Sequence, residues 1–313
     1  TIRNTYLFLF LLKPLNPFVL SIQLKDTFIF LTICELIVAS TVFPSADVDI
    51  ELDYDGSGQP GQPDWDVLIL TQQWPVTTCY HWMEENQSHI CNLPQKKEFW
   101  TIHGIWPTAY GKVGPNFCNK TALFDVKKLE GILADLTTYW PQLELSGPDG
   151  ESLWKHEWMK HGTCAMIVPE LDDERKYFEQ GLQWRNKYLI SDILSSAGIH
   201  PDSSNTVINI QSALKRVLNR NPSIHCIYDR QKDASFLSEI RVCFNKTLDL
   251  IDCDGVMSGQ VAIDYPGGKV ITNCHISKPV QYPSIVPPLQ KDAWQFPFVN
   301  VYKLLNFIMW FTL

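Results

Sequence analysis

The sequence predicts an α+β fold, in which helices and strands are not arranged as regular β-α units. Apolar stretches of the strand type occur around residues 65–74 and 99–106, and again in the second half of the chain. Apolar residues at helical spacing fill much of the region between them. Because the two kinds of element do not alternate strictly, the pattern favours α+β over a doubly wound parallel sheet.

The composition is that of a folded chain without a broad basic surface. The 313 residues are 45% hydrophobic and 19% charged, so a packed core is expected and global disorder is not. The formal net charge of −8 argues against a nonspecific phosphate-binding surface. It leaves room for a local basic site that handles a single phosphodiester.

The first 64 residues precede the predicted domain. Residues 27–43 form an almost wholly apolar run that follows Lys25 and ends near small residues, which is typical of a signal peptide. Glu35 and the shortness of the run argue against a membrane span. We therefore expect a signal or leader region over residues 1–45. Residues 46–64 are acidic and rich in Gly and Pro, and we expect a flexible leader there.

The remaining elements follow in chain order. A buried strand is predicted within WDVLILTQQW (65–74), ended by Pro75, and a second within FWTIHGIW (99–106). Helices are predicted at 125–139, at 151–161 with Gly162 ending the helix, at 172–197 and at 208–219. Strands are predicted around 224–228, 238–244 and 269–274. The apolar tail 289–313 is interrupted by polar residues, so we expect no stable membrane span there and assign it no role.

The cysteines and the glycosylation motifs indicate the secretory pathway. Of nine cysteines, Cys34 lies in the apolar N-terminal run, and the other eight form an even set that suits four disulfides. Acceptor motifs begin at Asn86, Asn119 and Asn245. The alternative, a cytosolic enzyme with free thiols, is not supported by any C-x-x-C zinc pair. We expect a secreted protein or one in the lysosomal or endosomal lumen.

The segment WKHEWMKHGTC (154–164) resembles the H-E-x-x-H zinc motif but is one residue too long. In a regular α-helix His156 and His161, five residues apart, would project about 140° from each other, whereas a zinc pair projects about 40° apart. Glu157, Lys160 and His161 would share one face. An ammonium there disfavours a dication and favours an anion, so we expect no metal and no cofactor. The simpler alternative is a solvated helix face with ion pairs.

A second histidine, His103, ends the predicted strand at 99–106. A lone histidine in a strand is more often a core residue than a catalyst. Gly104 next to it permits close approach of another group, and Trp106 is an aromatic surface on which a base could stack. A core tryptophan is an equally good interpretation of Trp106 alone. Together with the helix at 151–161, however, the segment provides an imidazole pair, a carboxylate and an ammonium, which suits phosphoryl chemistry.

FWTIHGIWP (99–107) and WKHEWMKHGTCA (154–165) resemble the two active-site segments of the RNase T2 family, the acid, transferase-type ribonucleases that include the plant S-RNases. ILTQQWPVTTC (69–79) resembles the family's opening strand, and the similarity runs over residues 65–288. The late cysteines and the YPSIVPP ending are most similar to the animal members. The resemblance implies a ribonuclease domain with an antiparallel β-sheet packed by helices.

The resemblance also implies a metal-free cleavage of single-stranded RNA to 2′,3′-cyclic phosphates and then 3′-phosphates. By position it implies that His161 is the general base and His103 the general acid. Glu157 and Lys160 match the groups that polarise the phosphate and stabilise the transition state, and His156 matches a phosphate-binding histidine. Trp106 matches a base-stacking residue, and Gln73 lies in a region that can contact a second base.

Two further implications concern the disulfides and base preference. The resemblance implies the pairs Cys79–Cys91, Cys118–Cys164, Cys226–Cys274 and Cys243–Cys253. Many members have Asp directly after the W-P of the first segment, whereas this chain has Thr108, so a preference for adenine does not carry over.

We therefore expect a monomeric, secreted or endolysosomal endoribonuclease whose partner is single-stranded RNA. One alternative is a secreted glycoprotein effector that acts on cells or receptors, with ribonuclease activity secondary. Comparing the biological effect of the wild type with that of a His161 variant that lacks nuclease activity would separate these two hypotheses. A third hypothesis, a zinc hydrolase, predicts loss of activity in a chelator.

Overall fold

The structure is a computed structural model that describes residues 64–86, 88–95, 99–145, 152–256, 261–289 and 309. The expected leader regions 1–45 and 46–64, except Asp64, and almost all of the tail 289–313 lie outside these residues. Among the helices that are described, none is both long and apolar enough to cross a membrane.

Within the described residues, nine strands form one sheet whose main path runs β3-β1-β7-β6-β10-β9. Its strands are β1 (Val67–Gln73), β3 (Thr101–Thr108), β5 (Ser203–Asn205), β6 (Ser223–Asp229), β7 (Ala234–Phe244), β8 (Leu250–Ile251), β9 (Val261–Tyr265), β10 (Gly268–Thr272) and β11 (Val280–Tyr282). A separate pair joins β2 (Ile90–Cys91) to β4 (Glu144–Leu145). The central pairs β3–β1, β1–β7 and β7–β6 are antiparallel, whereas β6–β10 and β7–β11 are parallel. The α+β class is confirmed, with a sheet that is more mixed than the resemblance implied.

Helices surround this sheet. The α-helices are α2 (Pro75–Glu85), α3 (Leu133–Tyr139), α4 (Ser152–Glu157), α5 (Thr163–Ala165), α6 (Glu174–Lys187), α7 (Ile190–Ser195) and α8 (Val207–Leu218). Short 3₁₀ turns occur at η1 (Val126–Leu129) and η3 (Pro169–Leu171), and η2 (Trp158–Gly162) is a π-helix. Pro75 does not merely end β1. It begins α2, because its missing N–H and fixed φ suit the first helical turn.

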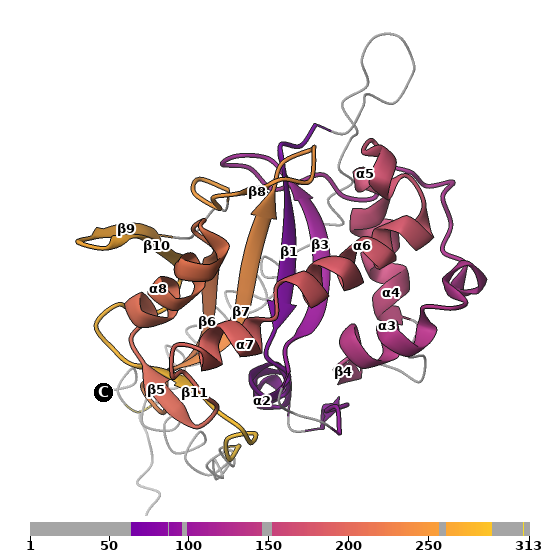
Figure 1. The fold of residues 1–313 in the computed structure, drawn as a ribbon. Coiled ribbons are helices and arrows are strands. Elements are labelled where there is room, and N and C mark those ends of the chain that lie inside the picture. Colours follow the sequence, from indigo (N-terminus) through magenta and orange to yellow (C-terminus); the bar gives the residue numbers. More distant parts are fainter. Residues whose placement is uncertain are drawn as a thin grey trace, which may run out of the picture. The chain divides into compact units, whose positions relative to one another are not determined.

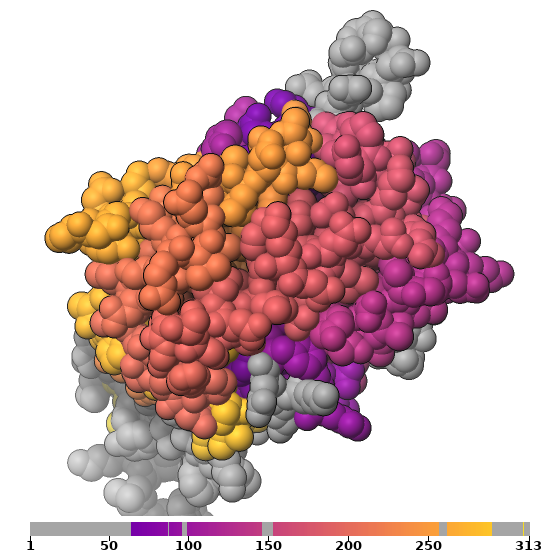
Figure 2. Space-filling view, viewed as in Figure 1, coloured from indigo at the N-terminus to yellow at the C-terminus, as the bar shows by residue number. Residues whose placement is uncertain are grey.

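The two faces of the central strands have different neighbours. On one face Leu68 and Leu70 of β1 enter the main hydrophobic core, together with Tyr177 and Phe178 of α6. Helix α6 runs across β1 and β3 on this side (Figure 1). In the space-filling view the residues of α6 and α7 cover most of β1 and β3, and those of α8 lie over the neighbouring part of the sheet (Figure 2). Because side chains alternate along a strand, Thr71 and Gln73 face the other side, where the candidate site lies.

Two predicted helices are interrupted. The one predicted at 125–139 is split into η1 and α3 at Gly131, whose φ of 91° is outside the helical region. The one predicted at 172–197 is split into α6 and α7 around Tyr188, whose φ and ψ are −115° and 72°. The Gln72 side chain donates to the Tyr188 carbonyl at 2.9 Å, which satisfies an acceptor that the broken helix leaves free.

Four disulfides connect the described cysteines, as the sequence predicts. They join Cys79 to Cys91, Cys118 to Cys164, Cys226 to Cys274 and Cys243 to Cys253. Cys118–Cys164 ties the loop after β3 to α5. His103 lies on β3, and His161 lies on η2, which runs directly into α5. This disulfide therefore holds the two predicted site segments together.

Candidate active site

A β-bulge in β3 places His103 on the same side of the strand as Trp106. Thr71 of β1 pairs with Gly104, whereas the next residue, Gln72, pairs with Ile102, so His103 is the extra residue. In a regular strand, residues three apart would lie on opposite faces. The bulge removes this separation, and the rings of His103 and Trp106 meet edge to face with centroids 5.0 Å apart.

The helix that carries the second histidine is not a regular α-helix. α4 leads into the π-turn η2 and then into α5, and Gly162 has helical φ and ψ of −58° and −40°. The prediction that Gly162 ends the helix is therefore wrong. In a π-turn residues i and i+5 are joined by a hydrogen bond, so side chains five apart come onto one side. The rings of His156 and His161 accordingly lie 6.3 Å apart.

Because of this geometry, the separation of His156 and His161 expected in a regular α-helix is no argument against a metal site. One ligand atom each from His156, Glu157 and His161 lies within 4.8 Å of the others, so the expected separation of about 140° does not exist. The chemical objection to a bound metal ion remains. Burial lowers the pKa of both histidines, and the nearby Lys160 ammonium lowers it further. A positive charge that disfavours protonation of these rings also disfavours a bound cation.

Two glycines allow the close packing of the site. A Cβ on Gly104 would lie 2.1 Å from Glu157 Oε2 and 2.3 Å from Trp106 Nε1. Those two atoms form a 3.0 Å hydrogen bond in which the indole donates. A Cβ on Gly162 would lie 2.3 Å from the Trp158 ring, which is buried in the core and anchors the π-turn. The expected role of Gly104 in close approach is thus present in the structure.

Burial shifts the pKa values of the helical site residues in opposite directions. It lowers the pKa of His161 to about 3, and the neighbouring Lys160 adds to the effect. It raises the pKa of Glu157 to about 7, against the opposing effect of His103, Trp106 and Lys160. The Nδ1 atom of His161 is buried and has no hydrogen-bond partner among the described residues. Nε2 is therefore the ring nitrogen left to accept a proton.

His103 lies in a different electrostatic environment. Its Nδ1 is 2.8 Å from Oε1 of Glu239, a largely buried carboxylate on β7. Burial alone would lower the pKa of His103, but the hydrogen bond and charge of Glu239 raise it above the ordinary value of 6.5. The site thus contains one imidazole that favours the neutral form and one that favours the protonated form.

Trp106 connects the strand residues to the helix residues. Its ring centroid is 5.7 Å from that of His161, and the Arg241 guanidinium lies over its ring at 5.1 Å. The indole is half-buried, so one part remains accessible to a ligand. Thr108, at the end of the same strand, is almost fully buried, and its hydroxyl is 3.4 Å from the Trp106 carbonyl.

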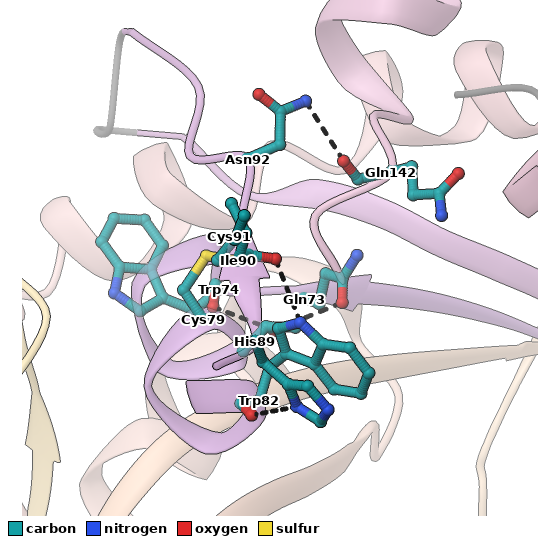
Figure 3. The surroundings of a disulfide bond; sticks show 10 residues. Gln73, Trp74, Cys79, Trp82, His89, Ile90, Cys91, Asn92 and Gln142 are labelled. Atoms are coloured by element: carbon teal, nitrogen blue, oxygen red, sulfur yellow. Dashed lines mark hydrogen bonds between the residues drawn. A yellow bond between two sulfur atoms is a disulfide. The ribbon is translucent and has the colours of Figure 1, made fainter. Parts of the chain in front are cut away.

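A cleft of about 420 Å³ opens beside these groups. His103, His156 and Glu157 line one part of it. Another part is lined by polar and aromatic residues, which include Gln73, Trp82 and Gln142. Figure 3 shows this second part next to the Cys79–Cys91 disulfide, where Trp82 and His89 stack with ring centroids 3.6 Å apart. Gln73, predicted to contact a second base, therefore lies in the same cleft as the histidines.

Four of the seven predicted site residues line this cleft, namely Gln73, His103, His156 and Glu157. Trp106 and His161 lie next to them, with Trp106 hydrogen-bonded to Glu157 and the His161 ring 6.3 Å from that of His156. Lys160 is near enough to His161 to lower its pKa. Sequence reasoning missed two neighbours, Glu239 and Arg241. A signal for them exists, because the strand ASFLSEIRVCF carries an acidic and a basic residue in an otherwise apolar and buried segment. Charged residues in such a place are seldom left unpaired.

Comparison with known proteins gives the family. A model of the Ribonuclease T2 family matches residues 65–253. Ribonuclease Oy of Magallana gigas is 39% identical over 197 residues, which cover 61% of this chain and 88% of that protein. The crystal structure of human RNase T2 superposes with a TM-score of 0.55 at 28% identity, covering 70% of this chain and 99% of that one. RNase NT in complex with 5′-AMP superposes with a TM-score of 0.56 at 26% identity, covering 70% and 98%.

The family model spans more than half of the chain and includes both histidine segments, and the superposed structures each cover 70% of the chain. The fold, the four disulfides and the sequence matches agree. This chain therefore belongs to the Ribonuclease T2 family, and it is a T2-type endoribonuclease.

Proposed function

We propose that this endoribonuclease cleaves single-stranded RNA by metal-free transesterification, with His161 as general base and His103 as general acid. The observation that carries the proposal is the pair of histidines next to Trp106. Their ring centroids lie 5.7 Å and 5.0 Å from the indole, and their pKa values are shifted in opposite directions. A neutral and a protonated imidazole facing one phosphodiester can act as base and acid in the same step.

In the first step, Nε2 of His161 takes the proton of the ribose 2′-hydroxyl. The 2′-oxygen forms a bond to phosphorus, the bond from phosphorus to the 5′-oxygen breaks, and His103 gives its proton to that leaving oxygen. The product is a 2′,3′-cyclic phosphate. In the second step water attacks phosphorus and gives a proton to His103, while His161 returns its proton to the 2′-oxygen. The result is a 3′-phosphate and a restored enzyme.

Lys160, Glu157 and His156 are proposed to stabilise the charge that develops on the phosphate. The Lys160 ammonium is close enough to His161 and Glu157 to influence the pKa of each. Burial raises the pKa of Glu157 to about 7, so below that pH its carboxyl is mostly neutral and can donate a hydrogen bond to a phosphate oxygen. His156 is an exposed part of the cleft wall, where it can contact the phosphate directly.

Trp106 and Gln73 are proposed to contact the bases. Trp106 is accessible beside both histidines, and an indole can stack on a base with about 1–3 kcal/mol per base. Gln73 lines the cleft together with Gln142, so amide groups are available for a second base. The nucleotide complex of RNase NT supports a nucleotide ligand for this type of site.

A secreted or endolysosomal location is also proposed. Four disulfides are stable in oxidising compartments. At Asn86, Asn119 and Asn245 the hydroxyl of the third residue of the motif donates to the asparagine Oδ1, at 2.8, 2.7 and 2.8 Å. These asparagines are exposed or partly exposed, so a glycan could be attached at each. Glycosidase treatment of protein secreted from eukaryotic cells, followed by mass measurement, tests this.

The function is tested on a short RNA with one cleavable linkage, with mass analysis of the products. We expect cyclic phosphate ends first and 3′-phosphate ends later, and no cleavage when the 2′-hydroxyl before that linkage is replaced by hydrogen. His103→Phe and His161→Phe should each lower the rate by about 10²–10⁴-fold. His200→Phe, at an exposed histidine outside the site, is the control. Unchanged cleavage in either site variant would overturn the assignment.

A further inference from the structure

Glu239 is a largely buried carboxylate that binds two groups of the site at once. Its Oε1 is 2.8 Å from His103 Nδ1, and its Oε2 accepts from Arg241 Nη2 at 2.6 Å and from Nε at 3.0 Å. The side chains of Glu239 and Arg241 are only 13% and 11% exposed. A carboxylate with little contact to water has to be compensated by such partners, and Glu239 has one on each oxygen.

The strand register explains how a residue of β7 reaches one of β3. Both strands flank β1, on which Gln73 pairs with Glu239 and Thr71 pairs with both Arg241 and Gly104. These residues share one face of the sheet, and the bulge adds His103 to that face. Thr71 is small and Gly104 has no side chain, so the space above β1 is open for the carboxylate and the imidazole to meet.

We propose that Glu239 is a positioning residue for His103, which holds the imidazole with Nδ1–H on the carboxylate and Nε2 toward the leaving oxygen, and stabilises its protonated form. This inference rests on the proposed function, in which His103 is the acid. Glu239 does not touch the substrate in this proposal. It acts through His103, and Arg241 acts one step further away by keeping Glu239 ionised.

Three carboxylates surround His103, and their electrostatic states differ. Burial raises the pKa of Glu157 to about 7, and it also raises the pKa of Glu144. For Glu239, burial alone would raise the pKa, but His103 and Arg241 together hold it below its ordinary value. Glu239 is therefore the one of these three carboxylates whose surroundings favour the ionised form.

Other charged and titratable groups also lie around His103 and Glu239. Two of them, His156 and His161, oppose protonation of His103, whereas Arg241 and His225 act on Glu239. They come from four elements: His156 on α4, His161 on η2, Arg241 on β7 and His225 on β6. Burial lowers the pKa of both His156 and His161, whereas the pKa of His103 is raised, so protonation favours His103 over the other two rings. Burial also lowers the pKa of His225 to about 3, so this ring adds little positive charge next to Glu239.

The test is the pH profile of kcat/KM for cleavage of the single-linkage RNA by Glu239→Gln. The amide has the same shape and can still accept from Nδ1, but it carries no charge. We expect the high-pH limb, where His103 loses its proton, to move down by about one pH unit, so that kcat/KM above that limb falls about tenfold. Glu239→Asp restores the charge and should return the limb toward its wild-type position, at a lower kcat because the side chain is shorter.

Glu174→Gln is the matched control. Glu174 is a fully buried carboxylate that pairs with Lys128 at 3.4 Å and accepts from the Asp125 N–H, away from the site. Its replacement should lower Tm without moving either limb of the pH profile. A purely structural role for Glu239 predicts this same result for Glu239→Gln.

If Glu239→Gln cleaves with the wild-type pH profile while His103→Phe is inactive, the inference is wrong and the proposed function stands. If His103→Phe remains active, the proposed function itself is wrong. Should Glu239→Gln not fold, NMR titration of His103 in the wild-type protein decides. A His103 that titrates above 6.5 with a slowly exchanging Nδ1 proton supports the inference, and one that titrates at or below 6.5 overturns it.

Discussion

Replacement of Gly104 by alanine tests the packing on which the site depends. The new Cβ would lie 2.1 Å from Glu157 Oε2 and 2.3 Å from Trp106 Nε1, whereas real Cβ contacts are not shorter than 3.0 Å. Glu157 therefore has to move by about 0.9 Å, and its 3.0 Å hydrogen bond from Trp106 is lost or distorted. Glu157 is constrained, because its side chain is 2% exposed and cannot move into water.

The expected magnitude follows from these contacts. Loss of a hydrogen bond to a buried charged group costs about 1.5–3 kcal/mol, and overpacking costs about 1–3 kcal/mol. Small shifts of the neighbouring groups can relieve either the overpacking or the lost hydrogen bond, but not both. We therefore expect the free energy of unfolding to fall by about 3 kcal/mol, which lowers Tm by about 6–12 °C. A misplacement of this size at a catalytic group lowers kcat by about 10²-fold.

The measurements are thermal unfolding and kcat on the single-linkage RNA, below the unfolding range of the variant. Gly267→Ala is the control, since its Cβ would meet only the edge of Tyr265 at 2.7 Å, in the β9–β10 turn. There the neighbouring ring can shift, and we expect a small change in Tm and none in kcat. A Gly104→Ala enzyme with wild-type Tm and kcat would refute the close approach of Glu157 to β3.

Three other predictions concern pH, metal and the disulfide between the site segments. Because His161 must be neutral and burial lowers its pKa to about 3, the rising limb of the pH profile should lie near pH 3, and activity should fall above 6.5, where His103 loses its proton and Glu157 ionises as well. A rising limb near 6.5 in the measured profile would contradict the burial of His161. Cleavage should be unchanged after EDTA treatment, because Lys160 disfavours a cation at the site, and a loss restored by added Zn²⁺ would favour the zinc hydrolase. Cys118→Ser with Cys164→Ser should cost about 4 kcal/mol in unfolding experiments, from the closed loop of 46 residues, and should lower kcat because the two segments are no longer tied together.

Local patterns in the sequence were sufficient for the main elements. Strands β1 and β3 and helices α6 and α8 were predicted because a run of apolar residues with the right period has few other ways to be buried. The eight cysteines beyond Cys34 and the two histidine segments likewise indicated a disulfide-bonded ribonuclease before any coordinates. The missed elements were short, such as β5 and β11, or began at a residue that the sequence suggested only as a strand stop, as α2 does at Pro75.

The geometry of the site could not be predicted in the same way. Regular helix geometry predicts that His156 and His161 point away from each other, but the π-turn brings their rings onto one side of the helix. In that turn the Trp158 ring packs against Gly162. Insertion of one residue into a strand or helix changes which side chains share a face. Whether such an insertion occurs depends on packing against other elements, which local periodicity does not record.

The sequence by itself determined the class of fold, the family and the identity of the groups that can do the chemistry, because these depend on residue types and local spacing. The tertiary structure alone decided which groups meet. It brought Glu239 of β7 across β1 to His103, and it placed Trp106 within ring-contact distance of both histidines. It also set the direction of each pKa shift, because burial and neighbouring charges arise only when distant segments pack together.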